Sequence, residues 1–265
     1  MNKYILAAGL LVAPVMAHPS SGQDLRDLPQ AEIVFLGEVH DNPLHHENQS
    51  EGIKAVRPAA LVFEMLTSAQ AARVTPDLRT DQAALQAVLD WDTSGWPDFD
   101  MYYPLFAAAP QAAIFGAALP RDAARAAMGQ PLEHVLAGDG ARFGLDRPLP
   151  QDQQIAREAL QARAHCDALP ESLLPAMVDI QRLRDAMLAA AALDAYRATG
   201  GPVVVIAGTG HTRTDWGAPA LLAQAAPELD ILSIGQFETA PDALSHDIHI
   251  VTAPHPRPDP CAAFQ

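Results

Sequence analysis

Short apolar runs alternate with helical patterns along most of the chain. The runs are continuous, as expected of strands that are covered on both faces. They lie at residues 31–36, 60–64, 112–116, 202–207, 229–234 and 248–251. The helical patterns between them lie at residues 45–56, 80–89, 121–128 and 216–225. This alternation predicts an α/β fold with a mainly parallel central sheet flanked by helices.

The stretch 132–199 contains no convincing strand pattern. Two parts of it, 151–168 and 170–199, are rich in Ala, Leu, Gln and Arg, which are good helix formers. We therefore expect a helical insertion before the fourth strand, packed over one edge of the sheet, within one domain that spans residues 18–265. The tail 253–260 has a proline at every second position from Pro254, which precludes regular structure there.

Charge and composition exclude some classes of partner. The 265 residues carry a formal net charge of −15, and no basic run is present. A nucleic-acid-binding protein needs a basic face, so nucleic acid is excluded as a partner. Anionic membranes are disfavoured for the same reason.

The N-terminus resembles an export signal. Lys3 precedes the apolar stretch 4–15, and a small-residue cleavage pattern ends at Ala17. We expect cleavage after Ala17 and a soluble periplasmic or secreted protein. No cysteine follows the apolar stretch, so a lipid anchor is not expected.

The chain contains two cysteines, Cys166 and Cys261. In an oxidising compartment an even number of cysteines favours a disulfide, which would tie the helical insertion to the proline-rich tail. The alternative is a pair of metal or haem ligands. The wide spacing disfavours that alternative, because neither cysteine belongs to a Cys-x-x-Cys motif.

Carboxylates and imidazoles follow three of the predicted strands. Glu38 and His40 come after the first strand, Glu64 after the second and His211 after the fourth. In an open parallel sheet, ligands bind beyond the carboxyl ends of the strands. If the strands are parallel, these four side chains meet at one edge. A carboxylate beside His40 would orient the ring and raise its basicity. The structural alternative makes Glu38 a helix cap and His40 a backbone partner.

Further residues each have a functional and a structural interpretation. Glu64 could share a proton with Glu38. Gly208 and Gly210 permit positive φ and close backbone approach before His211, and a helix that begins near residues 214–216 could face an anion with its amides. The third glycine of a dinucleotide fingerprint is missing, so no dinucleotide site is predicted.

Several candidates lie on predicted helices. We expect one of His45 and His46 to face the site and the other to face solvent, with His46 as the choice for the site. Arg184 and Asp185, near the helical stripe of Met177, Gln181 and Leu188, either reach a buried anion or form a surface ion pair. His165 is a ligand or an ordinary capping residue. The aromatic segment 91–103 is a surface or lid for a flat ligand, or a local core under a loop.

Together, the motifs of this chain resemble the ChaN family, a haem-binding group of bacterial iron-uptake proteins in the Tiki/TraB/erythromycin-esterase superfamily. The matching motifs are Gly-Glu-Val-His-Asp with His-His-x-x-Gln, Phe-Glu-Met, Gln-Arg-Leu-Arg-Asp and Gly-Thr-Gly-His. The resemblance covers about residues 31–249. Members of the family are often lipoproteins, whereas this sequence lacks the lipid-accepting cysteine.

The resemblance implies a homodimer that holds haem between its subunits, associated with uptake of iron or haem and with an outer-membrane haem receptor system. A tyrosine is expected to bind the iron, with histidine and basic side chains near the propionates. The candidate tyrosines are Tyr102, Tyr103 and Tyr196, and the other candidate ligand-binding residues are His40, His46, His165, Arg184 and His211.

The wider superfamily includes hydrolases, which gives a second hypothesis. The water-activating residues of the erythromycin-esterase branch would correspond here to His40, Glu64 and His211. The Tiki branch binds a divalent metal, and Glu38, His40, Glu64 and His211 are suitable ligands for zinc or manganese. Haem carriage therefore rests on the resemblance, whereas the residues alone favour a hydrolase in which these four are catalytic.

Overall fold

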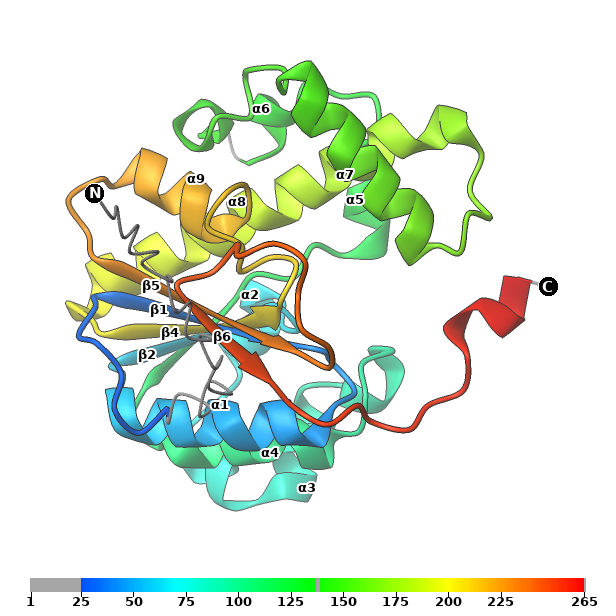
Figure 1. Cartoon of the computed structure of the whole chain (residues 1–265). Helices are drawn as coiled ribbons and strands as arrows, with labels where there is room; N and C mark the ends of the chain where they lie inside the picture. Colours follow the sequence, from blue (N-terminus) through cyan, green and yellow to red (C-terminus); the bar gives the residue numbers. More distant parts are fainter. Residues whose placement is uncertain (1–24, 137–138, 265) are drawn as a thin grey trace, which may run out of the picture.

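A sheet of six strands forms the centre of the part of the chain that this computed structural model describes, residues 25–136 and 139–264 (Figure 1). The strands are β1 (Ile33–Glu38), β2 (Ala60–Phe63), β3 (Ala113–Gly116), β4 (Val203–Gly208), β5 (Ile231–Phe237) and β6 (Ile248–Val251). Their order is β3-β2-β4-β1-β5-β6, and every pairing between neighbours is parallel. The predicted α/β fold is therefore confirmed.

Helices cover both faces of the sheet, which gives three layers (Figure 1). One face carries α1 (Pro43–Val56), α2 (Ser68–Ala71), α3 (Gln82–Val88) and α4 (Phe99–Ala108). The other carries α5 (Arg121–Ala127), α6 (Leu132–Val135), α8 (Leu174–Thr199) and α9 (Ala218–Ala225). α7 (Gln151–Ala164) packs against α8, so the predicted helical insertion before the fourth strand is present. Short 3-10 helices lie at Asp77–Thr80, Trp91–Thr93, Gly140–Phe143, Glu171–Leu173 and Pro260–Phe264.

The strands bury both of their faces because successive side chains point to opposite sides of a sheet. In β1, Val34 and Leu36 join the core beneath α1 and α4, whereas Ile33 and Phe35 join the core beneath α8. This double burial explains why the strands are continuous apolar runs rather than alternating ones.

The direction of the chain across the sheet reverses between β1 and β4. From β1 the chain crosses to β2 through α1, and from β4 it crosses to β5 through α9. Because α1 and α9 lie on opposite faces, the loops after β1 and β4 separate at the carboxyl edge. Such a switch point is where open α/β sheets bind ligands.

Most aromatic side chains of segment 91–103 belong to the main core, as in the structural alternative, whereas Trp96 lines a cavity. Trp91, Phe99 and Tyr102 are at least 97% buried and pack on one another at ring-centroid distances of 4.8–5.0 Å. The sequence analysis missed α4, which contains Pro104 and begins within this segment. Burial of its aromatic face outweighs the weak helix propensity of these residues.

A disulfide joins Cys166, just after α7, to Cys261 in the tail. The predicted bond is therefore present, and these sulfurs are not free to bind metal or haem. We call residues 252–261 the C-terminal strap. Arg257 in the strap donates to Asp41 Oδ2 at 2.7 Å and to Glu238 Oε2 at 2.6 Å. The strap thus runs from β6, past the loop after β1, to the end of α7. Residues 253–259 have no regular structure, as expected, and a 3-10 turn begins at Pro260.

Two expectations fall at the limits of the structure. The signal segment 1–17 and its cleavage after Ala17 lie outside the described residues. Within residues 25–136 and 139–264, no helix is long and apolar enough to cross a membrane.

Candidate functional site

The carboxyl edge of the sheet brings Glu38, His40, Glu64 and His211 together. Glu38 is the last residue of β1 and pairs in register with Gly208, the last residue of β4. The Glu64 amide donates to the Ile206 carbonyl at 3.0 Å, so Glu64 lies beside the same end of β4. The strand register therefore fixes the backbone from which these side chains project.

Glu38 is the most enclosed carboxylate of the group, with a fully buried side chain. Its Oε1 accepts from Nδ1 of His40 at 2.7 Å and from the Tyr102 hydroxyl at 2.8 Å. Its Oε2 lies 3.4 Å from Nδ1 of His46. Burial opposes ionisation, but the hydrogen bond from His40 and the nearby imidazoles outweigh it and lower the pKa of Glu38.

His40 is the most accessible imidazole of the site, with 34% of its side chain exposed. Its Nε2 lies 3.9 Å from Oε2 of Glu64, and its ring centroid lies 4.9 Å from that of Trp96. Burial lowers the pKa of His40. The hydrogen bond to Glu38 and the charge of Glu64 raise it by more than burial lowers it, so the net shift of the pKa is upward. The ring is thus held between two carboxylates.

A second imidazole, that of His211, lies between the carboxylates of Glu64 and Asp185. Its Nδ1 donates to Asp185 Oδ1 at 2.6 Å, and its Nε2 lies 3.4 Å from Glu64 Oε1. The Gln181 amide nitrogen lies 3.1 Å from both ring nitrogens. Burial lowers the pKa of His211, but Glu64 and Asp185 outweigh it and raise the pKa to about 10.

Carboxylates and imidazoles therefore alternate across the site. We call this set the acid–imidazole chain, and its members in spatial order are Glu38, His40, Glu64, His211 and Asp185. Glu64 also accepts from the Gly208 amide at 2.8 Å. Burial raises the pKa of Glu64, but His211 and His40 outweigh this effect and leave a strong net lowering. The acid–imidazole chain can therefore hold charge and protons at a largely buried site.

The glycine turn before His211 works by close approach rather than by positive φ. Neither Gly208 nor Gly210 has a positive φ, so that expectation is wrong. A Cβ on Gly208 would lie 2.9 Å from Nε2 of His40, so a side chain there would displace the ring. α9 begins only at Ala218, later than the predicted 214–216, and Gly217 precedes it. The idea that its amides face an anion at this turn is not supported.

His45 and His46 are both buried, at 0% and 2% exposed, which contradicts the expectation that one faces solvent. Asn42 caps α1 by accepting from the Leu44 amide at 3.0 Å, and both rings then point inward from the first turn. Nδ1 of His45 accepts from the Val39 amide at 2.8 Å, and Nε2 of His46 donates to the His40 carbonyl at 2.9 Å. They hold the loop after β1.

Three further candidates lie away from the acid–imidazole chain. The Tyr103 hydroxyl donates to the Arg79 carbonyl at 3.0 Å. Tyr196 packs against Gly201, just before β4 and therefore at the amino edge of the sheet. Nδ1 of His165 bonds the Gln161 carbonyl at the end of α7, which is the capping alternative. None of the three reaches the site.

A cavity of about 350 Å³ lies beside Glu64. Its lining includes Glu64, Met65, Trp96, Arg121, Arg184 and Leu188. Arg184 thus lines this cavity, whereas Asp185 beside it is buried and binds His211, so the two do not form the surface ion pair of the structural alternative. The cavity combines one flat aromatic side chain with two guanidinium groups.

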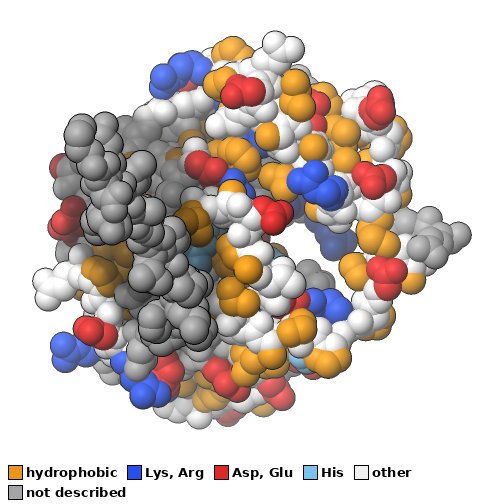
Figure 2. All heavy atoms as spheres, in the orientation of Figure 1, with side chains coloured by type: hydrophobic (Ala, Val, Ile, Leu, Met, Phe, Trp, Pro, Cys, Tyr) orange, Lys and Arg blue, Asp and Glu red, His pale blue; other side chains and the backbone are white. Residues whose placement is uncertain are grey.

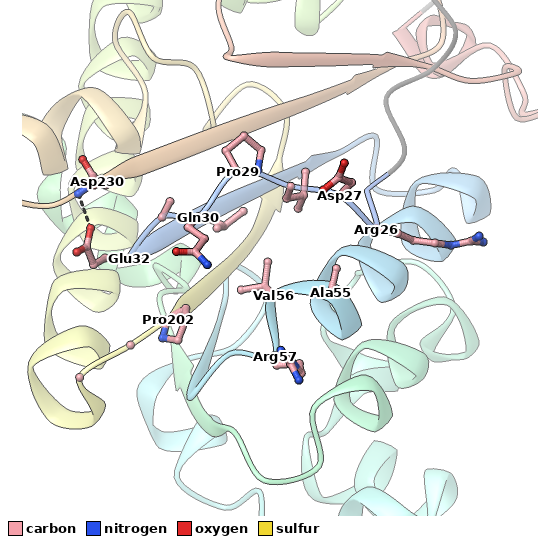
Figure 3. A pocket seen from close by; sticks show the side chains of 15 residues that line it. Arg26, Asp27, Pro29, Gln30, Glu32, Ala55, Val56, Arg57, Pro202 and Asp230 are labelled. Atoms are coloured by element: carbon pink, nitrogen blue, oxygen red, sulfur yellow. Dashed lines mark hydrogen bonds between the residues drawn. The ribbon is translucent and has the colours of Figure 1, made fainter.

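Three larger hollows lie elsewhere among the described residues, and no member of the acid–imidazole chain lines them. One of about 560 Å³ lies at the amino edge, where Glu32 accepts from the Asp230 amide at 2.6 Å (Figure 3). In Figure 2 an opening passes between the C-terminal segment and the rest of the molecule, on the side to which the strands point in Figure 1. The acid–imidazole chain lies at that carboxyl edge.

Sequence reasoning missed the roles of Asp185, Gln181 and Tyr102 as partners within the site. Gln181 and Asp185 lie one helical turn apart on α8, in a stretch where most neighbours are buried. Two polar residues on a helical stripe that is otherwise apolar were the sequence signal that could have indicated these partners. For the predicted metal, the residues that the structure describes contain no group of three or more His, Cys, Asp or Glu side chains placed to hold an ion.

Comparisons with known proteins were informative at the level of family and fold. A family model described as haem-binding uptake, Tiki superfamily, ChaN matches residues 25–222. No curated protein matches the chain. The solved structure of ChaN of Campylobacter jejuni, which describes cofacial haem binding, matches with a TM-score of 0.62 and 19% identity over 83% of this chain and 87% of that chain. The type III effector HopBA1 matches with a TM-score of 0.43 and 15% identity, over 84% and 88%.

Proposed function

Because the chain belongs to the ChaN family of haem-binding uptake proteins in the Tiki superfamily, we propose that it binds haem at the carboxyl edge of its sheet, with His40 as the iron ligand. One observation carries this assignment. The His40 side chain is 34% exposed, whereas the carboxylate bound to its Nδ1 is fully buried. This hydrogen bond leaves Nε2 as the nitrogen that can bind iron.

The tyrosines do not fit the role of ligand that the family resemblance implies. Tyr102 is fully buried and donates to Glu38. Burial and the charge of Glu38 raise the pKa of Tyr102, so its hydroxyl keeps the proton that iron would have to displace. Tyr103 is bonded to a backbone carbonyl, and Tyr196 lies at the opposite edge of the sheet.

The imidazole of His40 fits the role better. An iron-binding histidine commonly donates its other ring nitrogen to a carboxylate, which fixes the ring and strengthens it as a ligand. Glu38 supplies that carboxylate to Nδ1 at 2.7 Å. A bound haem would supply iron to Nε2, whose contact with Glu64 at 3.9 Å is too long for a hydrogen bond, and the protein would supply orientation and charge.

The neighbouring cavity suits part of a porphyrin. Trp96 offers a flat apolar surface, and Arg121 and Arg184 offer positive charge for propionates. At about 350 Å³, the cavity is near the lower end of the range for small-molecule sites, so much of a haem would stay outside it. We propose that a second copy of the chain covers that remainder, in a homodimer with haem between its subunits.

We extend the proposal to the place of action. The disulfide between Cys166 and Cys261 is typical of proteins in an oxidising compartment. It supports export, and we propose cleavage after Ala17 and release to the periplasm or the medium. There the protein would serve iron or haem uptake and pass haem to an outer-membrane receptor system.

Titration with hemin tests the binding proposal. Purified protein is mixed with hemin, and a saturable shift of the Soret band is expected for the wild type. His40→Ala should lose this shift, and His165→Ala, a change of the same residue type away from the site, should keep it. Unchanged binding by His40→Ala would reject His40 as the ligand, and no saturable binding by any form would reject haem.

A hydrolase is the second candidate, and the buried half of the acid–imidazole chain favours it. Haem bound to His40 makes no use of Asp185, although burying that carboxylate is costly. His211, with a pKa raised to about 10, would be protonated and could stabilise a developing oxyanion. His40, oriented by Glu38, would act as the general base toward water. An esterase and peptidase screen tests this, and equal activity of His40→Ala and wild type would remove it.

A further inference from the structure

A second cavity, of about 290 Å³, lies between α7, α8 and α9, on the other side of α8 from the cavity beside Glu64. Its lining combines apolar side chains with three arginines. The apolar members include Phe143, Leu145, Leu149 and Leu221, and the arginines are Arg147, Arg157 and Arg182. Three guanidinium groups around one cavity are unusual in a chain with a formal net charge of −15.

Arg157 is the central observation, because it is 93% buried by residue and no carboxylate among the described residues forms an ion pair with it. Burial lowers the pKa of Arg157 to about 10, although the charges of Asp185 and Asp215 act in the opposite direction. Its Nη2 donates to Gln153 Oε1 and to the Trp216 carbonyl, both at 3.2 Å. Its Nε is buried and has no hydrogen-bond partner. A buried cation normally requires a counter-ion in contact with it, and the two carboxylates near Arg157 compensate its burial only in part.

Arg182 supplies a second charge on the α8 side of the cavity. It is 8% exposed, and its Nη2 donates to the carbonyls of Gly144 at 3.2 Å and Arg147 at 2.7 Å. These bonds hold the loop 144–147 around the cavity. Its one carboxylate contact is at 3.4 Å to Asp179, whose side chain is 48% exposed. Solvent screens that contact, so most of the Arg182 charge remains available.

The acid in the cavity lining is already neutralised. Asp215 accepts from Arg213 Nε at 2.9 Å and Nη2 at 2.6 Å, which is a bidentate pair. The Arg213 guanidinium in turn lies 3.9 Å from the Trp216 ring centroid, and that of Arg157 lies 5.2 Å from it. Trp216 thus contacts two cations and lines the cavity.

We propose that this cavity is a binding site for a small organic anion with an apolar, planar body. Its carboxylate or phosphate group would accept from the guanidinium groups of Arg157 and Arg182, which line the cavity. Its body would lie among Trp216, Phe143 and Leu149. Inorganic ions would bind less well, because they would leave the apolar lining in contact with water.

The test uses the full chain without haem, so its result is independent of the haem proposal. Isothermal titration calorimetry measures binding of benzoate, phenyl phosphate, inorganic phosphate and neutral benzamide. Saturable binding of benzoate or phenyl phosphate is expected, at least about tenfold tighter than benzamide, because charge-assisted hydrogen bonds are at stake. Equal binding of benzamide, or equal binding of inorganic and phenyl phosphate, would overturn the proposal.

Variants then locate the site. Arg157→Gln should weaken the binding about tenfold or more, and Arg163→Gln, the same change at an exposed position of α7, should leave it unchanged. Ala220→Leu fills the cavity from α9 without touching an arginine and should abolish binding, which covers the case that Arg157→Gln does not fold. Full binding by Ala220→Leu would place the ligand elsewhere and reject this site.

Discussion

Asp185 on α8 binds His211, which follows β4, at 2.6 Å between Oδ1 and Nδ1. Both residues are more than 90% buried, and Asp185 is only 1% exposed. A buried ionised carboxylate costs several kcal/mol unless an opposite charge and hydrogen bonds compensate it. The two residues therefore depend on each other, and this pair joins the helical insertion to the sheet edge.

Asp185→Asn should lower the pKa of His211. The wild-type pKa is raised to about 10 by Glu64 and Asp185 against the effect of burial, and the variant loses one of these two charges. The proton affinity should fall about tenfold or more. An NMR titration of the imidazole signals measures this directly, and an unchanged His211 titration would show that Asp185 does not hold the proton there.

The same pair predicts how stability depends on pH. Because the folded pKa of His211 lies above its ordinary value near 6.5, its contribution is complete below that pH and is lost as the pH rises through about 10. Glu64 acts in the opposite direction, because its pKa is lowered in the folded protein. Its contribution to stability is complete above about pH 4.5 and is lost on acidification. Urea unfolding from pH 4 to 10 should show a smaller alkaline decrease for Asp185→Asn than for the wild type.

Gly208→Ala should weaken haem binding without unfolding the protein. The new Cβ would lie 2.9 Å from Nε2 of His40, and the ring can move because it is the end of a side chain. Gly210→Ala is the matched control, since a Cβ there would meet nothing within 4 Å. Hemin titration of both variants, with melting temperatures beside it, measures the effect. Equal binding by the two would show that the position of His40 does not matter.

Tyr102→Phe should cost about 1–2 kcal/mol of stability and keep haem binding. The change removes one donor to Glu38 but preserves the buried ring, and the His40 hydrogen bond remains. Urea unfolding and a hemin titration measure the two effects. Loss of the Soret shift in this variant, with the fold intact, would make Tyr102 the iron ligand after all.

Cys261→Ser should lower the free energy of unfolding by about 3–5 kcal/mol, because the disulfide closes a loop with a sequence separation of 95. Cys166→Ser should have the same effect, and the double variant should be no worse than either single one. Thermal unfolding under non-reducing conditions provides the measurement. A midpoint equal to that of the wild type would mean that the strap adds nothing to the fold.

The sheet could be predicted because double burial leaves a continuous apolar run for each strand, most clearly at β4. The ends were less certain. β1 continues two residues beyond the predicted Leu36, because the Glu38 carbonyl accepts from the Thr209 amide at 2.9 Å. Gly37 and Glu38 resemble a turn by composition, and only the neighbouring strand extends them.

The candidate site likewise contains residues whose meeting the sequence predicts and residues whose place it does not predict. Glu38, His40, Glu64 and His211 meet because the topology of a parallel sheet aligns its strand ends, and a sequence conveys that topology. Asp185 and Tyr102 join them because α8 and α4 present particular faces to the sheet. The rotation of a helix about its axis depends on side-chain packing across two layers, which the sequence pattern does not specify.

The disulfide turns everything from Cys166 to Cys261 into a covalent ring that contains His211 and Asp185, whereas Glu38, His40 and Glu64 belong to the open chain before it. A protease that cuts once inside the ring leaves its two pieces attached to each other. A cut between Glu64 and Cys166 instead divides the acid–imidazole chain between two separable fragments. Limited proteolysis without reductant thus shows by fragment size where the chain was cut. A single cut inside the ring leaves the mass of the linked chain unchanged, whereas a cut between Glu64 and Cys166 gives two smaller fragments.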